Sequence, residues 1–110
     1  MKAAIFHPGA RETIRSFPAE VRKELGKAIF DLQRGESLGM PLSRAMPSLG
    51  VGASELRIRD RVGTYRVFYL VKSARGILVF HAFAKKSRTT PAHELAIGKK
   101  RLKELLDEED

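Results

Sequence analysis

Cysteine is missing from this sequence, and long apolar runs are missing as well. Without cysteine the chain has no disulfide framework, no thiolate nucleophile and no sulfur ligand for zinc. The apolar stretch near the N-terminus covers only residues 3–6 before Pro8, which is too short for the apolar region of a signal peptide. Nowhere do 18 apolar residues follow one another, as a membrane-spanning helix requires. We therefore expect a cytoplasmic protein with no membrane partner.

Acidic residues are few outside the C-terminus. The chain has 13 Asp and Glu residues, of which four are the last four residues and nine are widely spread. A carboxylate pair or a two-metal nuclease site would have to be assembled from distant positions. The histidines at 7, 81 and 93 lack metal-ligand spacing, and the sequence has neither a Walker-type phosphate loop nor a His-Glu-x-x-His motif. The sequence therefore predicts neither a metal site nor a small-molecule cofactor.

Basic residues, in contrast, are abundant. Lys and Arg total 21 and give a net charge of +8. Without the four C-terminal acids, 21 basic residues stand against nine acidic ones, a net charge of +12. So large an excess on a small surface attracts polyphosphates or acidic proteins, and RNA is our first choice.

The length of 110 residues, 43% of them apolar, predicts one domain over residues 1–106 with a core between two layers. We expect the acidic tail, residues 107–110, to fray, because the C-terminus of a helix is the negative end of its macrodipole. A helical turn or two is expected over residues 10–16. A longer helix begins at Pro18 and is stopped by Gly35, and another begins at Pro91 with Thr89 or Thr90 as its capping hydroxyl.

Four segments have the pattern of β-strands, and short glycine-containing connections join the last three as antiparallel hairpins. We therefore predict an α+β fold with a twisted antiparallel sheet of about four strands. Residues 36–54, rich in Gly, Pro and Ser, are predicted to form a long loop that its apolar residues pin to the core. The predicted strands are residues 3–6, 55–60, 64–72 and 76–86.

The basic residues are concentrated on or beside this sheet. Leu56 and Ile58 alternate with arginines, so period two places Arg57 and Arg59 together on the opposite face. Arg66 stands alone among apolar neighbours, so it either pairs with a carboxylate such as Glu55 or faces a site, and we favour the site. The whole group comprises Arg57, Arg59, Arg61, Arg66, Lys85, Lys86 and Arg88.

Such a cation cluster has the properties needed for RNA cleavage by the RNA's own 2′-hydroxyl. That hydroxyl must lose a proton, the phosphorane must have its extra negative charge stabilised, and the 5′-oxygen must be protonated as it leaves. Arginine binds phosphate at two points, and a lysine crowded by cations has a lowered pKa. No metal is required for any of these steps.

The segments SELRIRD, GTYRVFYLV and GILVFHAFAKKSRTTP, followed by a helix, resemble the RelE/ParE toxin superfamily, especially its phage-related HigB-like branch. The resemblance covers residues 38–106. It implies a RelE-like microbial RNase fold, with an N-terminal strand and helices packed on the sheet and a C-terminal helix. It also implies a toxin of a type II toxin-antitoxin system, an endoribonuclease that cleaves mRNA on the ribosome and is neutralised by a cognate antitoxin protein.

By motif position, the resemblance implies that the family's functional basic residues correspond to Arg57, Arg59, Arg66 and Lys86. Lys85 is the alternate for Lys86. RelE-type nucleases often have a tyrosine shortly after the last of these, but no tyrosine follows Tyr69 here. His93 is our candidate for proton transfer in its place. The predicted catalytic residues are Arg57, Arg66, Lys86, Lys85 and His93, and the predicted RNA-binding residues are Arg57, Arg59, Arg61 and Arg88.

Two other functions stay open. A ParE-like toxin would inhibit DNA gyrase through protein contacts without cutting RNA, and a non-catalytic relative would bind nucleic acid with salt-dependent affinity alone. A second histidine, His81, lies in the middle of a predicted strand. We expect it to be a hydrogen-bonded interior residue.

Overall fold

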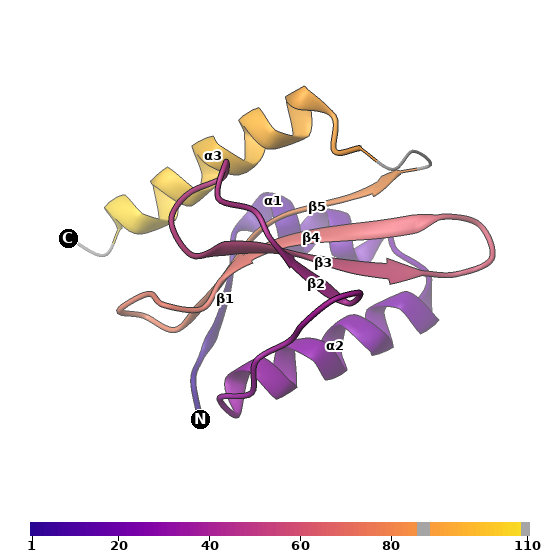
Figure 1. Ribbon diagram of the computed structural model, residues 1–110, viewed down its shortest axis with the longest axis horizontal. Helices are drawn as coiled ribbons and strands as arrows, with labels where there is room; N and C mark the ends of the chain where they lie inside the picture. The colour runs from indigo at the N-terminus through magenta and orange to yellow at the C-terminus, as the bar shows by residue number, and fades with distance from the viewer. Residues whose placement is uncertain (86–88, 109–110) are drawn as a thin grey trace.

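The computed structural model describes residues 1–85 and 89–108. It has an α+β arrangement in which a single sheet runs through the middle of the molecule (Figure 1). The predicted strand near the N-terminus and the predicted helices are all present. In chain order the elements are β1 (Ala4–Phe6), α1 (Pro8–Arg15), α2 (Ala19–Gln33), β2 (Ser43–Ala45), β3 (Ala53–Arg59), β4 (Thr64–Leu70), β5 (Ile77–Lys85) and α3 (Ala92–Asp107).

The sheet has five strands in the order β1-β5-β4-β3-β2. Strands β3, β4 and β5 form the predicted antiparallel meander. Two features differ from the prediction. Strand β1 joins the edge of the sheet parallel to β5, and β2 forms inside the predicted loop and pairs antiparallel with β3. The sheet is therefore mostly, not wholly, antiparallel.

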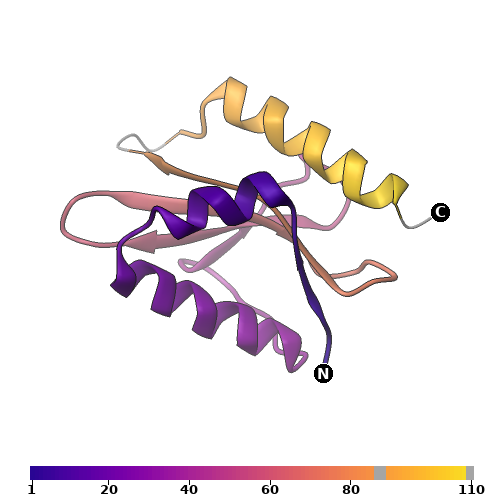
Figure 2. The same cartoon turned by 180° about the vertical axis from the view of Figure 1, so that it is seen from behind.

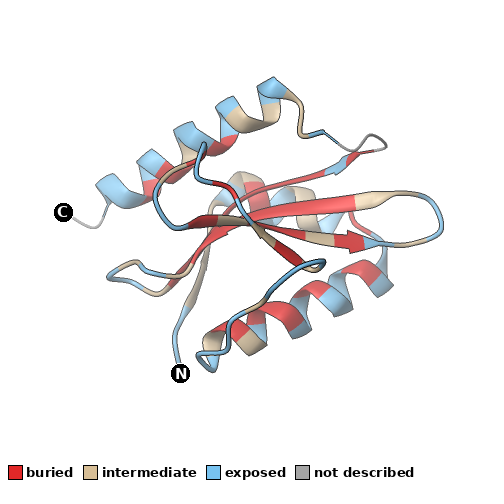
Figure 3. Ribbon diagram, in the orientation of Figure 1, coloured by how far each residue is buried: buried red, intermediate tan, exposed pale blue. Residues whose placement is uncertain are grey.

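Helices cover both faces of the sheet. Helices α1 and α2 lie together in Figure 2, and the core on their side contains Val21 and Leu25 of α2 with Leu56 and Ile58 of β3. Helix α3 lies against the other face, where its residue Leu102 shares a second core with phenylalanines of β4 and β5. Figure 3 shows the buried residues along the central strands, between these layers. Alternation along each strand thus sends every second side chain toward α3.

The ends of the helices follow local chemistry. Gly35, with a φ of 91°, follows α2 as predicted, since a left-handed conformation suits glycine. Helix α3 includes Asp107, which was expected to belong to the frayed tail; its carboxylate lies 3.2 Å from Lys103 Nζ, and Glu108 pairs with Arg75. The last two acids of the tail lie outside the described residues. No described helix is long and apolar enough to cross a bilayer.

Candidate functional site

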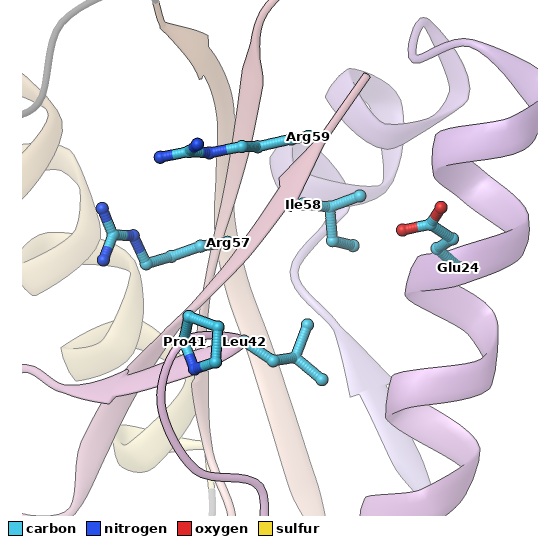
Figure 4. Close-up of a pocket in the computed structure, with 6 residues that line it drawn as sticks. All are labelled: Glu24, Pro41, Leu42, Arg57, Ile58 and Arg59. Carbon is cyan, nitrogen blue, oxygen red and sulfur yellow. The ribbon is translucent and has the colours of Figure 1, made fainter. Parts of the chain in front are cut away.

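Five basic side chains gather on the α3-facing side of the sheet. We call them the basic cluster: Arg44 of β2, Arg57 and Arg59 of β3, Arg66 of β4 and Lys85 of β5. In the sheet register Arg57 lies directly opposite Arg66. The next row places Thr64 of β4 between Arg59 and Lys85. Figure 4 shows Arg57 and Arg59 on one side of β3 and Ile58 on the other, as the predicted alternation requires.

Glu55 lies at the centre of the basic cluster and is fully buried. Its Oε1 accepts a hydrogen bond of 2.6 Å from Arg66 Nη1 and lies 3.6 Å from Arg44 Nη2. Its Oε2 accepts a hydrogen bond of 3.1 Å from the Thr90 hydroxyl. The cluster therefore contains five cations and one carboxylate, and it keeps a large excess of positive charge.

Arg66 settles one alternative that the sequence left open. Its side chain is 2% exposed and forms the ion pair with Glu55, the structural option that we had not favoured. The pairing uses Nη1, however, and Arg66 Nε remains without a hydrogen-bond partner among residues 1–85 and 89–108. Arg66 is thus anchored to Glu55 and still belongs to the cluster.

Three buried nitrogen atoms of the cluster have no hydrogen-bond partner within the described part of the chain. They are Arg44 Nε, Arg66 Nε and Lys85 Nζ. Nearly all buried polar groups in proteins are hydrogen-bonded, and an unpaired buried donor destabilises the fold by about 1–3 kcal/mol. An anion with several oxygens satisfies donors arranged in this way. Unpaired donors grouped among cations make this cluster the candidate anion-binding site of the described chain.

Burial and the neighbouring cations lower the pKa values of two members of the cluster. Burial, followed by the charges of Arg66 and Arg44, lowers the pKa of Arg57. Burial lowers the pKa of the Lys85 ammonium as well, Arg66 lowers it further, and the Glu55 carboxylate opposes the shift. A lysine with a lowered pKa exchanges its proton more readily near neutral pH, which is a property of catalytic lysines.

A surface hollow of about 430 Å³ adjoins the cluster beside residues 57–59 of β3. Pro41, Leu42 and Ile58 give it apolar walls, and Figure 4 shows the Glu24 side chain reaching into it from α2. Arg57 and Arg59 also line it. A chain of alternating phosphates and bases would have space beside the cations here.

The remaining predicted site residues do not all join the cluster. Arg61 is exposed in the turn between β3 and β4, which the Asp60 carboxylate holds by accepting hydrogen bonds from the backbone N–H groups of Val62 and Gly63. His93 is 73% exposed on α3, and its ring lies 3.5 Å from Glu94. The structure does not bring His93 to the basic cluster. Lys86 and Arg88 lie outside the described residues.

His81 is an interior residue, as predicted. Its Nδ1 lies 3.0 Å from Arg101 Nη1, and because a guanidinium only donates, Nδ1 must accept this hydrogen bond. The proton is therefore on Nε2, which donates to Glu94 across 2.7 Å. Burial lowers the pKa of His81, so the ring is held neutral in this network between β5 and α3.

Sequence reasoning missed two contributors to the site, Arg44 and Thr90. Arg44 lies in a three-residue strand, too short to show an alternating pattern. Thr89 or Thr90 was expected to cap the last helix, but Pro91 occupies that position, and the Thr90 hydroxyl donates to Glu55. Within residues 1–85 and 89–108, no group of three or more His, Cys, Asp or Glu side chains is placed to hold a metal ion.

Comparisons with known proteins bear on the family and the fold of the chain. The family model described as phage-derived protein Gp49-like matches residues 12–103. A solved structure of the Escherichia coli toxin RelE, a double arginine-to-alanine mutant in the free state, superposes with a TM-score of 0.53. The match covers 96% of this chain and 98% of that one at 18% identity, which supports the shared fold. A search of curated proteins found no match. The structural match confirms the predicted RelE-like fold. The family match agrees with the predicted resemblance to a phage-related family.

Proposed function

The chain belongs to the phage-derived Gp49-like family, and on that premise we propose that it is the toxin of a type II toxin-antitoxin system that cleaves mRNA. In this proposal it is a metal-independent endoribonuclease that acts in the cytoplasm on mRNA bound to the ribosome. A cognate antitoxin protein binds it and blocks its activity. The solved protein with the same fold, RelE, is named as a toxin, and the proposal extends that role to this chain.

The observation that carries the proposal is the set of unpartnered nitrogens in the basic cluster. Arg57 and Arg66 bind the scissile phosphate and stabilise the charge of the phosphorane. The 2′-oxygen forms a bond to phosphorus while the bond to the 5′-oxygen breaks, so one proton must leave the 2′-hydroxyl and one must reach the 5′-oxygen. Lys85, with its lowered pKa, is suited to this proton transfer. Lys86, next in the chain, remains a candidate for the same role.

The test is inducible expression in a bacterial host with primer-extension mapping of transcripts. Wild-type protein is expected to arrest growth and to produce discrete cuts within coding frames. Arg57→Ala, Lys85→Ala and Lys86→Ala are expected to relieve the arrest in proportion to the loss of cutting. Lys27→Ala, on the exposed side of α2, is the matched control and is expected to remain toxic. Full toxicity of these three variants and of their combination contradicts the proposal.

The same induction separates the two other functions. A DNA-damage response with intact transcripts indicates a gyrase inhibitor of the ParE kind. Salt-dependent binding to RNA with neither cleavage nor growth arrest indicates a non-catalytic relative. Either result replaces the nuclease proposal.

A further inference from the structure

The buried Glu55 carboxylate is the one acidic group found at the centre of the basic cluster in the described part of the chain. It receives contacts from three separate segments. Arg44 approaches from β2, Arg66 from β4, and Thr90 from the segment that precedes α3. The two carboxylate oxygens divide these partners, because the arginines share Oε1 and the threonine hydroxyl donates to Oε2. The orientation of the carboxylate is therefore fixed from both sides.

We infer that Glu55 is a positioning residue of the site, which holds the guanidinium groups of Arg66 and Arg44 in place for a phosphate of the RNA backbone. The inference rests on the proposed function. Glu55 engages an Nη atom of each arginine and leaves both Nε atoms without a partner in the described chain. Those free donors lie in the same cluster as the unpartnered Lys85 Nζ. The carboxylate thus anchors the two arginines from one end while their other donors stay available.

A purely structural ion pair does not explain this arrangement. A buried ion pair contributes little net stability, and apolar residues of similar volume often replace one without loss. Here one carboxylate contacts two arginines and acts electrostatically on Arg57 and Lys85. The arginines that it holds keep unsatisfied donors, which lowers stability further. A site prepared for a phosphate accounts for both features, because the substrate supplies the missing negative charge and the missing acceptors.

Thr90 contributes to the same arrangement by holding the Glu55 carboxylate. Its hydroxyl fixes Glu55 Oε2 and so prevents the carboxylate from rotating away from the arginines. It also ties the cluster to the start of α3. The isosteric change Thr90→Val removes this hydrogen bond and keeps the shape, whereas Thr90→Ser keeps the hydroxyl.

The experiment measures single-turnover cleavage of a defined mRNA on purified ribosomes across a range of pH. The variants are Glu55→Gln, Glu55→Asp, Thr90→Val and Thr90→Ser, with Glu12→Gln on the exposed side of α1 as control. Glu55→Asp retains the charge but shortens its reach, and it is expected to lower the rate on the order of 10²-fold without moving the pH profile. Thr90→Val is expected to give a smaller loss that Thr90→Ser restores.

Glu55→Gln is expected to change the pH profile of cleavage, which a loss of stability alone would not do. The groups that act on Lys85 are Arg44, Arg57, Arg66 and Glu55, and only Glu55 opposes the lowering of its pKa. Removing that charge lowers the pKa of Lys85 further, so the pH profile of cleavage is expected to shift toward lower pH along with the loss in rate. Thermal unfolding of each variant shows that folded protein was assayed.

The possible outcomes separate the positioning role of Glu55 from the proposed function. Folded Glu55→Gln and Glu55→Asp that cleave at the wild-type rate, with the wild-type pH profile, overturn the positioning role and leave the proposed function standing. If neither Glu55 variant folds, Thr90→Val carries the test, and a wild-type rate in that variant overturns the inference. Absence of cleavage by the wild-type protein itself refutes the proposed function instead.

Discussion

Replacing Gly98 with alanine tests how closely α3 approaches the sheet. A Cβ atom at this position would lie 2.7 Å from Phe68 Cδ2 and 3.0 Å from Leu49 Cδ2. The Phe68 ring is fully buried and packs against Phe80 and Phe83, so it has little room to move aside. Overpacking of this kind destabilises by about 1–3 kcal/mol, while alanine in a helix recovers about 1 kcal/mol relative to glycine. We expect a net loss of up to about 2 kcal/mol in the free energy of unfolding.

Gly26 of α2 provides the matched control, because no described atom outside the local helix lies within 4 Å of a Cβ built there. Gly26→Ala is expected to raise the free energy of unfolding by up to about 1 kcal/mol through helix propensity alone. Urea denaturation and thermal unfolding measure both variants, and each 1 kcal/mol corresponds to about 4–8 °C in Tm for a small domain. If Gly98→Ala is as stable as Gly26→Ala, the close approach of α3 to Phe68 is wrong.

Three further predictions concern the core, the histidine network and RNA binding. Phe68→Ala is expected to lower the free energy of unfolding by about 3–5 kcal/mol in urea denaturation, and a loss below about 1 kcal/mol contradicts the packing. Because the pKa of His81 is lowered in the fold, the unfolded chain binds more protons as pH falls below about 6.5, so stability decreases there. Urea unfolding at pH 5 and 7.5 should show a smaller difference in His81→Gln, and an unchanged difference counts against the network. Binding of a 2′-O-methyl oligonucleotide is expected to weaken with salt, with a log-log slope reduced by about 0.7 in Arg57→Ala if that residue contacts one phosphate.

Much of the fold could be predicted because its pattern is local. Leu56 and Ile58 alternate with arginines, and that period of two correctly placed Arg57 and Arg59 on one face of β3. Gly35 and Pro91 likewise mark helix boundaries through their own backbone preferences. The parallel pairing of β1 with β5 was not predicted, because it depends on the path of the chain through α1 and α2.

The rest of the site depends on contacts between segments distant in the sequence. Arg44 reaches Glu55 only because β2 pairs with β3, and Thr90 reaches the same carboxylate from 35 residues away. Nothing in either local sequence indicates these partners. For Arg66 the sequence offered either an ion pair with a carboxylate such as Glu55 or a place in a site, and we favoured the site. The ion pair that the structure shows depends on the register that places β3 beside β4.

The central claim is that a metal-free cation cluster cleaves RNA through the RNA's own 2′-hydroxyl. The most direct measurement is the chemistry of the new ends after cleavage of an mRNA on purified ribosomes, with a matched transcript carrying a single 2′-deoxynucleotide at the cut site. Attack by the 2′-oxygen leaves a 2′,3′-cyclic phosphate and a 5′-hydroxyl, and the 2′-deoxy substitution should abolish the cut. New 5′-phosphate ends, or cleavage at the 2′-deoxy position, would contradict the account.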